Sequence, residues 1–139
     1  MIVNRNDFHR TKYGTYGVGM QILTNSSYDQ MEVNLATRLI EKRRQHYKDG
    51  VIAFDCGANI GVHTIEWAKN MTEWGEVFSF EPQEKIYYAL SGNIAINNCF
   101  NVTAKNVALG SVIGKIEIPT PNYHKPSSFG SLELKEKKN

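Results

Sequence analysis

The residues from Phe54 to Gly61, FDCGANIG, combine an acid with two glycines at the end of an apolar run. Asp55 ends the run that begins at Val51, and a helical pattern starts after Gly61. Glycines let a backbone bend sharply and approach a ligand closely, and the first turn of a helix presents free N–H groups. The spacing therefore predicts a binding loop, in which Asp55 accepts hydrogen bonds from the loop, from water or from a ligand ammonium group. A tight turn without a ligand is the simpler alternative.

A second acid, Glu81, ends the next apolar segment and precedes Pro82. At the end of the second strand of a nucleotide-binding βαβ unit, a carboxylate can accept hydrogen bonds from both ribose hydroxyls. Asn106 lies near the end of a third apolar segment. Taken alone, Asp55 could be a helix N-cap and Glu81 a surface acid, but their combination with the glycine loop favours a nucleotide-type ligand.

Apolar periodicity predicts the elements that position these groups. Helices are expected at about 28–47, 62–71 and 82–97, and strands at 51–55, 76–80 and 102–107. Further short strands are expected around 18–23 and at 115–118. Alternating strands and helices at this spacing form a parallel sheet with right-handed crossovers, and ligands of such sheets bind beyond the carboxyl ends of the strands. Asp55, Glu81 and Asn106 all fall at or near those ends.

Three segments follow from this organisation. Residues 1–50 form an N-terminal strand and a cap helix, in which Met31, Leu35 and Leu39 recur at helical spacing. Residues 51–118 form the cofactor-binding βαβαβ unit, and residues 119–139 form a loop-like tail.

Composition indicates one ordinary globular domain of 139 residues, with 41% apolar and 22% charged residues. The formal charge of +2 is too small to argue for nucleic acid. There is no apolar run of membrane-spanning length, and the N-terminus lacks the apolar region of a signal peptide, which favours the cytoplasm. Cys56 and Cys99 are then expected to be reduced, buried side chains. We predict no metal site.

The loop departs from the dinucleotide fingerprint G-x-G-x-x-G, because Asp55 stands where the first glycine is expected. A G-K-[ST] phosphate loop is also absent from the sequence. An acid at this position disfavours a pyrophosphate and favours a ligand with a cationic amino acid part, such as S-adenosylmethionine. An NAD-binding oxidoreductase fragment is the weaker alternative for the same reason.

Three segments in order resemble the FkbM-type S-adenosylmethionine-dependent methyltransferases: VIAFDCGANIGVHTIEWA, VFSFEPQEKIYYALSGNIAINN and NVTAKNVALG. The preceding segment GTYGVGMQILTNSSYDQMEVNLATRLI also resembles that family, so that the similarity covers roughly residues 14–111. The resemblance implies an α/β, Rossmann-like class I methyltransferase fold around the parallel βαβαβ core, with a sheet that is incomplete in this chain.

The resemblance also implies which residues bind the cofactor. Those that would hold its methionine part are Asp55, Gly57, Ala58, Asn59 and Gly61. Glu81 would hold the ribose hydroxyls with Pro82 beside the adenine, whose edge would be flanked by Asn106, Val107 and Ala108. Glu32 matches an acid that approaches the amino acid end of the cofactor. His63 falls where the family often has an aromatic residue, and a packed helix residue is favoured there over a base; no catalytic residue is assigned.

After Gly110 the sequence departs from the family, whose further strand carries an acidic K-I-D-x-E-G type motif and whose later strands close the sheet. A half-sheet would need its edge covered by a second copy, a completing second chain or swapping. The sequence thus favours an S-adenosylmethionine-dependent methyltransferase that acts on a hydroxyl of a small molecule or glycan. The alternative is a non-catalytic cofactor-binding or assembly module derived from a truncated methyltransferase.

Overall fold

The computed structural model describes residues 1–131, which form two compact units. The first, called here the sheet unit, consists of Met1–Ile2 and Asp29–Leu109. The second, the hairpin unit, consists of Val3–Tyr28 and the described residues from Gly110 onward. These units cut across the segment boundaries expected at residues 50 and 118, since residues from both parts of the chain gather in the hairpin unit. Residues 132–139 of the expected tail lie outside the described residues.

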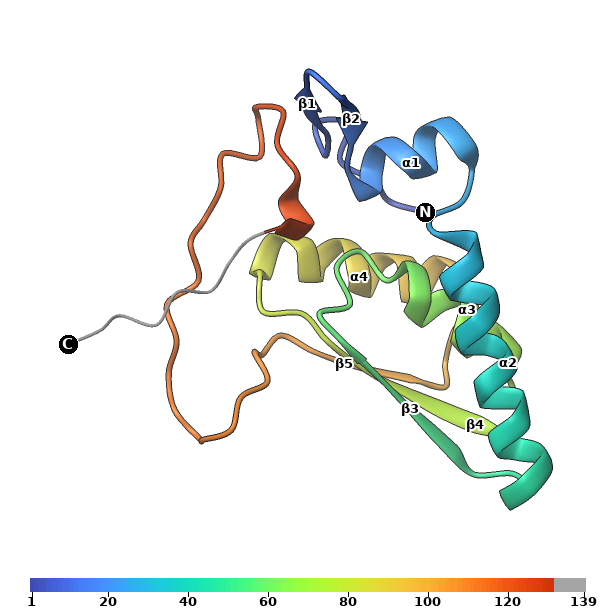
Figure 1. The fold of residues 1–139 in the computed structure, drawn as a ribbon. Coiled ribbons are helices and arrows are strands. Elements are labelled where there is room, and N and C mark those ends of the chain that lie inside the picture. Colours follow the sequence, from blue (N-terminus) through green and yellow to red (C-terminus); the bar gives the residue numbers. More distant parts are fainter. Residues whose placement is uncertain (132–139) are drawn as a thin grey trace. The chain divides into compact units, whose positions relative to one another are not determined.

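The sheet unit is a parallel βαβαβ core preceded by a long helix (Figure 1). Its elements are α2 (Gln30–Tyr47), β3 (Val51–Cys56), α3 (Val62–Asn70), β4 (Gly75–Phe80), α4 (Glu84–Ile96) and β5 (Val102–Lys105). The strands lie in the order β3-β4-β5, and both neighbouring pairs are parallel. The α/β class, the parallel sheet and the order of these elements confirm the sequence prediction, although β5 ends two residues earlier than expected.

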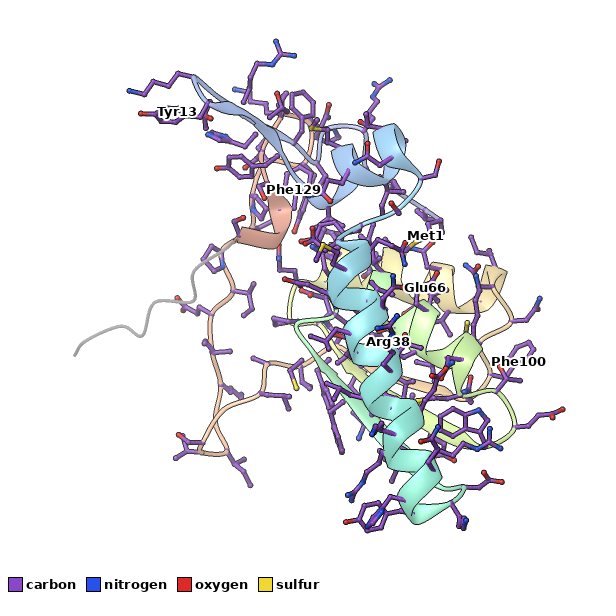
Figure 2. The ribbon with its side chains drawn as sticks, turned by 45° about the vertical axis from the view of Figure 1, so that its right-hand side comes forward. Met1, Tyr13, Arg38, Glu66, Phe100 and Phe129 are labelled. Atoms are coloured by element: carbon purple, nitrogen blue, oxygen red, sulfur yellow. The ribbon has the colours of Figure 1, made fainter. Side chains whose placement is uncertain are left out.

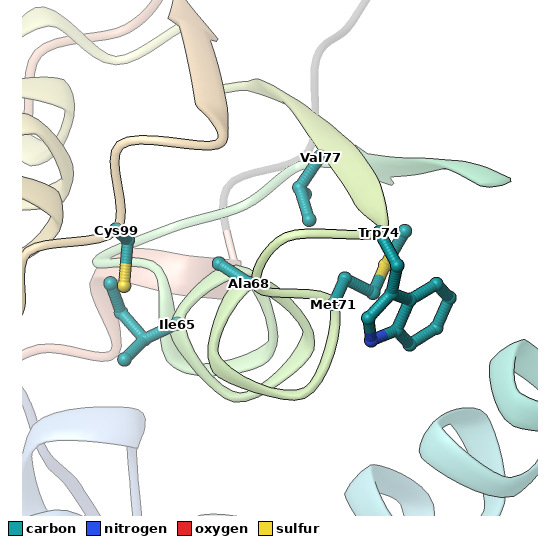
Figure 3. Packing of buried hydrophobic residues seen from close by; sticks show 6 residues of the cluster. All are labelled: Ile65, Ala68, Met71, Trp74, Val77 and Cys99. Carbon is teal, nitrogen blue, oxygen red and sulfur yellow. The ribbon is translucent and has the colours of Figure 1, made fainter. Parts of the chain in front are cut away.

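The core of this unit lies between the sheet and α3 (Figure 3). Its buried members are Ile65, Ala68, Met71, Trp74, Val77 and Cys99. Ile65 and Ala68 stand three residues apart and therefore share one side of α3, where they pack toward Val77 of β4. Cys99 is a buried free thiol, as predicted, whereas Cys56 is free but exposed, so the expectation of burial was wrong for Cys56.

The opposite face of the sheet is apolar and exposed. Ile52 and Phe54, which alternate with the core-facing residues of β3, are 53% and 60% exposed. Phe54 stacks on Phe78 and Phe80 of the neighbouring strand, with ring centroids 5.7 Å and 6.1 Å apart. Within residues 1–131, β3 pairs with β4 alone. Within the described residues the three-stranded sheet is therefore small, with a free edge at β3 and an exposed apolar face.

The hairpin unit is organised around a buried aspartate. Its elements are β1 (His9–Thr11), β2 (Gly14–Tyr16), α1 (Val18–Asn25) and the short 3-10 helix η1 (Phe129–Ser131). The carboxylate of Asp7 accepts the N–H of Gly19 at 2.9 Å through one oxygen and the N–H of Phe129 at 3.0 Å through the other. Asp7 therefore joins two segments that are far apart in the sequence.

Two expected strands were wrong. The segment 18–23 is helical and belongs to α1. Its apolar residues suit a strand, but the close approach of Gly19 to Asp7, where an added Cβ would lie 2.7 Å from the Asp7 Cβ, fixes a helical start that no local pattern reveals. Within residues 1–131 the segment 115–118 pairs with no strand and is irregular, and the nearby Val112 and Ile113 are exposed. Of the helices in residues 1–131, none has the length and hydropathy needed to cross a bilayer.

Candidate functional site

The carboxyl ends of the three parallel strands lie level with one another. In the register, Cys56 stands opposite Phe80, and Phe80 stands opposite Lys105. The residues that come directly after these positions therefore meet at one edge of the sheet. We call this edge the rim; it consists of Asp55, the loop Cys56–Gly61, Glu81–Pro82 and Asn106. The structure thus brings together the three polar residues that the sequence placed at the strand ends.

The backbone N–H groups of the glycine loop are used within the fold. Those of Gly57 and Ala58 both donate to the carbonyl of Phe80, at 2.9 Å and 3.0 Å. That of Gly61 donates to the carbonyl of Ala58 at 2.8 Å. A phosphate-binding loop needs such N–H groups free and convergent. The loop is therefore poorly suited to hold a pyrophosphate.

Glu81 is buried at the centre of the rim and holds the loop in place. Its Oε2 accepts the N–H of Asn59 at 2.9 Å, and its Oε1 accepts the N–H of Gln83 at 2.8 Å. Burial raises the pKa of Glu81 above its ordinary 4.5; these two N–H groups lower it in part, and the charge of Asp55 raises it further. The side-chain Oδ1 of Asn59 is buried without a hydrogen-bond partner in the described residues, which leaves an acceptor beside this carboxylate.

Asp55 is buried one strand away, where it meets two hydroxyl groups. The Thr64 hydroxyl donates to Oδ2 of Asp55 at 2.5 Å, and Thr64 Oγ1 lies 2.7 Å from Ser79 Oγ. Burial raises the pKa of Asp55 above its ordinary 3.8, while the hydrogen bonds from Thr64 and the charge of His63 oppose that rise. Asp55 therefore anchors the first turn of α3 to the sheet.

The two glycines of the loop differ in what lies next to their Cα atoms. Gly57 has a φ of +86°, and an added Cβ would meet nothing within 4 Å, so the loop is open to a close-lying ligand there. Gly61 has a φ of +89°, and an added Cβ would lie 2.6 Å from Cδ1 of Leu90. The missing side chain of Gly61 therefore makes room for α4 and not for a ligand.

The strand β5 is tied to the rim by Asn106. Its Nδ2 donates to the carbonyls of Glu81 and Pro82, at 2.8 Å and 3.1 Å. The N–H of Glu81 in turn donates to the carbonyl of Lys105 at 3.1 Å. The following residues Val107 and Ala108 remain partly exposed, so this side of the rim offers an accessible surface next to Pro82.

Two other sequence candidates lie apart from these contacts. Glu32 is exposed in the first turn of α2, and no hydrogen bond links its side chain to the rim in residues 1–131. The ring of His63 stacks on that of Trp67, with centroids 5.6 Å apart and an interplanar angle of 15°. This packing agrees with the interpretation of His63 as a packed helix residue.

Sequence reasoning missed three buried polar residues that support the rim: Thr64, Ser79 and Asn93. Asn93 donates from Nδ2 to the carbonyl of Ile60 at 2.7 Å and to that of Ile2 at 3.2 Å, while its Oδ1 accepts the N–H of Ile2. The sequence did contain a signal for two of these residues, namely polar side chains at positions where the apolar pattern expects a buried residue. Ser79 interrupts an apolar strand, and Asn93 stands three residues after the buried Leu90 on α4. Polar residues at core positions require partners.

A cleft of about 570 Å³ lies at the opposite, amino end of the strands, between α2 and Trp74. Its side chains largely engage one another. Arg44 pairs with Asp49 at 2.8 Å and covers the ring of Trp74, and Asn70 donates to Glu41 at 2.9 Å. The rim is the better candidate site, because its buried acids are concentrated at the end of the sheet where ligands of parallel α/β folds bind.

Comparison with known proteins gives the family. Residues 55–138 match the family described as the methyltransferase FkbM domain. The match spans well over half of the sequence, and the chain belongs to this family, as its motifs predicted. No curated protein matches the sequence.

Among solved structures, the chain is similar to a SAM-dependent O-methyltransferase from Thermotoga maritima. The sequence identity is 18% and the TM-score 0.49. The similarity covers 73% of this chain and 40% of that enzyme, so the chain spans less than half the length of this relative.

Proposed function

We propose that the sheet unit binds S-adenosylmethionine at the rim and serves as the cofactor half of a methyltransferase. The observation that carries this proposal is the pair of buried carboxyl groups, Asp55 and Glu81, which lie close enough for the charge of one to affect the other. Membership of the FkbM methyltransferase family supports the same function.

The charge of the rim favours a cationic ligand. Two carboxylates create a negative potential that suits a sulfonium or ammonium group and disfavours a phosphate. The loop N–H groups of Gly57, Ala58 and Gly61 are already paired with carbonyls, so they offer little to an anion. Both features weaken the alternative of an NAD-binding oxidoreductase.

Individual groups of the rim suit the parts of the cofactor. Each carboxylate oxygen of Glu81 accepts one N–H and retains a lone pair, which a ribose hydroxyl can use. The unpaired Oδ1 of Asn59 is an acceptor for an ammonium group, and the open side of Gly57 leaves space for the methionine part. Asn106, with Val107 and Ala108 after it, would line the adenine edge next to Pro82.

In this proposal the residues of the chain bind and orient. The cofactor supplies an already activated methyl group, so that catalysis consists mainly of positioning an acceptor in line with it. Asp55 acts through Thr64, because it fixes the start of α3 and with it the end of the loop. Glu81 fixes the loop at Asn59 and the start of α4 at Gln83.

The acceptor is proposed to be a hydroxyl of a small molecule or glycan. We propose that residues outside the sheet unit complete the acceptor pocket. The bare apolar face and the free edge of β3 are suited to hold such a completing part, whether from a second chain or from a second copy.

Calorimetric titration of S-adenosylmethionine and its demethylated product into the purified chain tests the proposal. We expect binding by the wild type and at least about tenfold weaker binding by Glu81→Ala, since the ribose contact and the loop anchor are both lost. Glu66→Ala, which removes an exposed acid of α3, is the matched control and should bind as the wild type does.

Competition and turnover separate the alternatives. Addition of NAD should not displace the cofactor, and displacement would favour the oxidoreductase. Cofactor binding without methyl transfer to any hydroxyl acceptor would favour a non-catalytic module. A folded wild-type chain that binds neither form of the cofactor would contradict the proposal for this chain.

A further inference from the structure

Helix α2 carries an apolar stripe on its outer face. Met31, Leu35 and Leu39, which recur every four residues, are 88%, 61% and 62% exposed. The contacts of α2 with the rest of the sheet unit come from the other side, where Val33 is buried and Ile40 packs against the core cluster. Figure 2 shows α2 in front, with Arg38 labelled on it.

Helical geometry places the stripe directly opposite the core-facing side. At about 100° per residue, Leu35 and Val33 lie about 160° apart around the axis of α2. Single exposed apolar residues are common on protein surfaces, but three at successive turns form a continuous seam. Such a seam is typical of helices that pack against another helix.

The residues around the seam are complementary to those of a second, antiparallel copy of α2. Leu35 and Leu39 are equally distant from Thr37, and so are Glu32 and Lys42. A two-fold axis at the level of Thr37 would thus bring Leu35 of one copy onto Leu39 of the other. The same operation brings Glu32 beside Lys42 twice. Both of these charged side chains are exposed, and neither has an ion-pair partner in residues 1–131.

We propose that two copies of the chain associate through α2, antiparallel about the level of Thr37. The helix has 18 residues and is therefore about 27 Å long, which allows a seam of Leu35 and Leu39 from both copies flanked by two Glu32–Lys42 pairs. A parallel arrangement would instead set Lys42 against Lys42 and Glu32 against Glu32. The antiparallel arrangement also sets the acidic start of each helix against the basic end of the other.

The interaction uses a surface other than the bare sheet face. That face lies on β3 and β4, whereas the seam lies on the side of α2 turned away from the core. A variant can therefore lose self-association through α2 and still bind the cofactor at the rim, or the reverse.

Analytical ultracentrifugation of the full chain over a range of concentrations tests the proposal. We expect a reversible dimer, and Leu35→Glu should weaken self-association at least about tenfold, because it places a charge in the middle of the seam. Glutamate preserves helix propensity, and circular dichroism confirms that the variant is folded. Ile96→Glu, at a comparably exposed apolar position on helix α4, is the matched control and should leave the dimer unchanged.

A charge exchange then tests the antiparallel register. Glu32→Lys and Lys42→Glu should each weaken the dimer, because each creates two like-charge contacts, and the double variant should restore it to within about threefold of the wild type. A wild-type chain that is monomeric at every concentration would overturn the proposal. A dimer that resists Leu35→Glu, or a double variant that fails to restore association, would do the same.

Discussion

Two carboxyl groups at the rim, those of Asp55 and Glu81, are buried in positions where an acid is costly unless it is hydrogen-bonded. Each is satisfied by groups of the fold: Asp55 by Thr64, and Glu81 by the backbone of Asn59 and Gln83. Even so, burial raises the pKa of both. These acids therefore hold the loop in its conformation, but their raised pKa values reduce the free energy of unfolding at neutral pH. Buried acids with raised pKa values are typical of binding sites.

The pH dependence of stability follows from the sign of these shifts. Because the pKa values of Asp55 and Glu81 are raised in the folded state, the folded chain keeps protons at a pH where the unfolded chain has lost them. The contribution of both groups to stability is therefore greatest at low pH, below the ordinary values of 3.8 and 4.5, and is lost as pH rises through the raised values.

We expect Asp55→Asn to flatten this decline, since asparagine keeps an oxygen acceptor for Thr64 and does not titrate. Urea unfolding between about pH 4 and about pH 8 measures the slope. Glu66→Gln, at an exposed position, should leave the slope unchanged. An Asp55→Asn variant with the wild-type slope would show that Asp55 does not titrate differently in the two states.

The hydroxyl of Thr64 gives a second prediction. Thr64→Val preserves the shape of the side chain but leaves Asp55 without its hydroxyl donor, and we expect a loss of about 1–3 kcal/mol in the free energy of unfolding. Thr103→Val removes an exposed hydroxyl from β5 and should change stability by less than about 0.5 kcal/mol. Denaturant unfolding at neutral pH measures both, and equal effects would contradict the role given to the buried hydroxyl.

Among the elements, the loop after β3 depends on α4 as much as on its own residues. Leu90 fills the space left by Gly61, and Asn93 binds the carbonyl of Ile60. The helix that follows the second strand therefore holds the loop that follows the first. The position of α4 thus determines the shape of the candidate site.

Glycine substitutions separate backbone strain from packing. An added Cβ at Gly57 contacts no other atom, so Gly57→Ala introduces only the backbone strain of a positive φ. We expect this substitution to lower the free energy of unfolding by about 1 kcal/mol. Gly61→Ala adds a clash with Leu90 and should cost at least about 1 kcal/mol more. In a Leu90→Ala background the extra cost should disappear, which a double-mutant cycle by denaturant unfolding measures. An extra cost that persists there would show that Leu90 is not its cause.

Some helices and strands could be predicted from the sequence, and others could not. The apolar runs of β3 and β4 and the periodicity of α3 predicted the sheet and the rim, because those elements bury their faces against each other locally along the chain. The strand expected at 18–23 failed because Asp7 determines that segment from a distance. The seam of Met31, Leu35 and Leu39 predicted α2 correctly, but the pattern does not say which face of the helix is buried, and the buried face carries Val33 instead.

The residues of the candidate site could also be predicted only where they did not depend on contacts between distant parts of the chain. Acids and glycines at strand ends identified Asp55, Gly57 and Glu81, whose types are unusual for their positions. The supporting contacts of Ser79 and Asn93 depend on neighbours in three dimensions, so the sequence alone did not assign them.

At the scale of the whole molecule, the two units rely on different interactions. The sheet unit rests on a continuous apolar core, while the hairpin unit is held together by the carboxylate of Asp7 and the buried ring of Phe129. Tyr123 packs edge-on against that ring, with centroids 4.9 Å apart, and its carbonyl accepts the side-chain amides of Asn4 and Asn6. Loss of Asp7 should therefore affect one unit selectively.

We expect Asp7→Ala to open the hairpin unit while the sheet unit keeps its protection. The variant leaves the N–H groups of Gly19 and Phe129 without their acceptor, at a cost of about 1–3 kcal/mol each. Hydrogen exchange followed by mass spectrometry should show faster exchange around both residues and unchanged exchange in β4. Asp49→Ala, at an exposed position, is the control, and equal loss of protection in both units would contradict the prediction.

The bond between Asp7 and Phe129 spans 122 residues of sequence, which has a consequence for the chain as it leaves the ribosome. Translation delivers residues from the N-terminus, and segments that hold all their partners can fold as soon as they emerge. Residues 29–109 carry the whole βαβαβ core, so this part can fold while synthesis continues. The segment Val3–Tyr28 precedes that core in the chain but gains its contact with Phe129 only after synthesis has passed residue 129, so the hairpin unit is completed after the sheet unit.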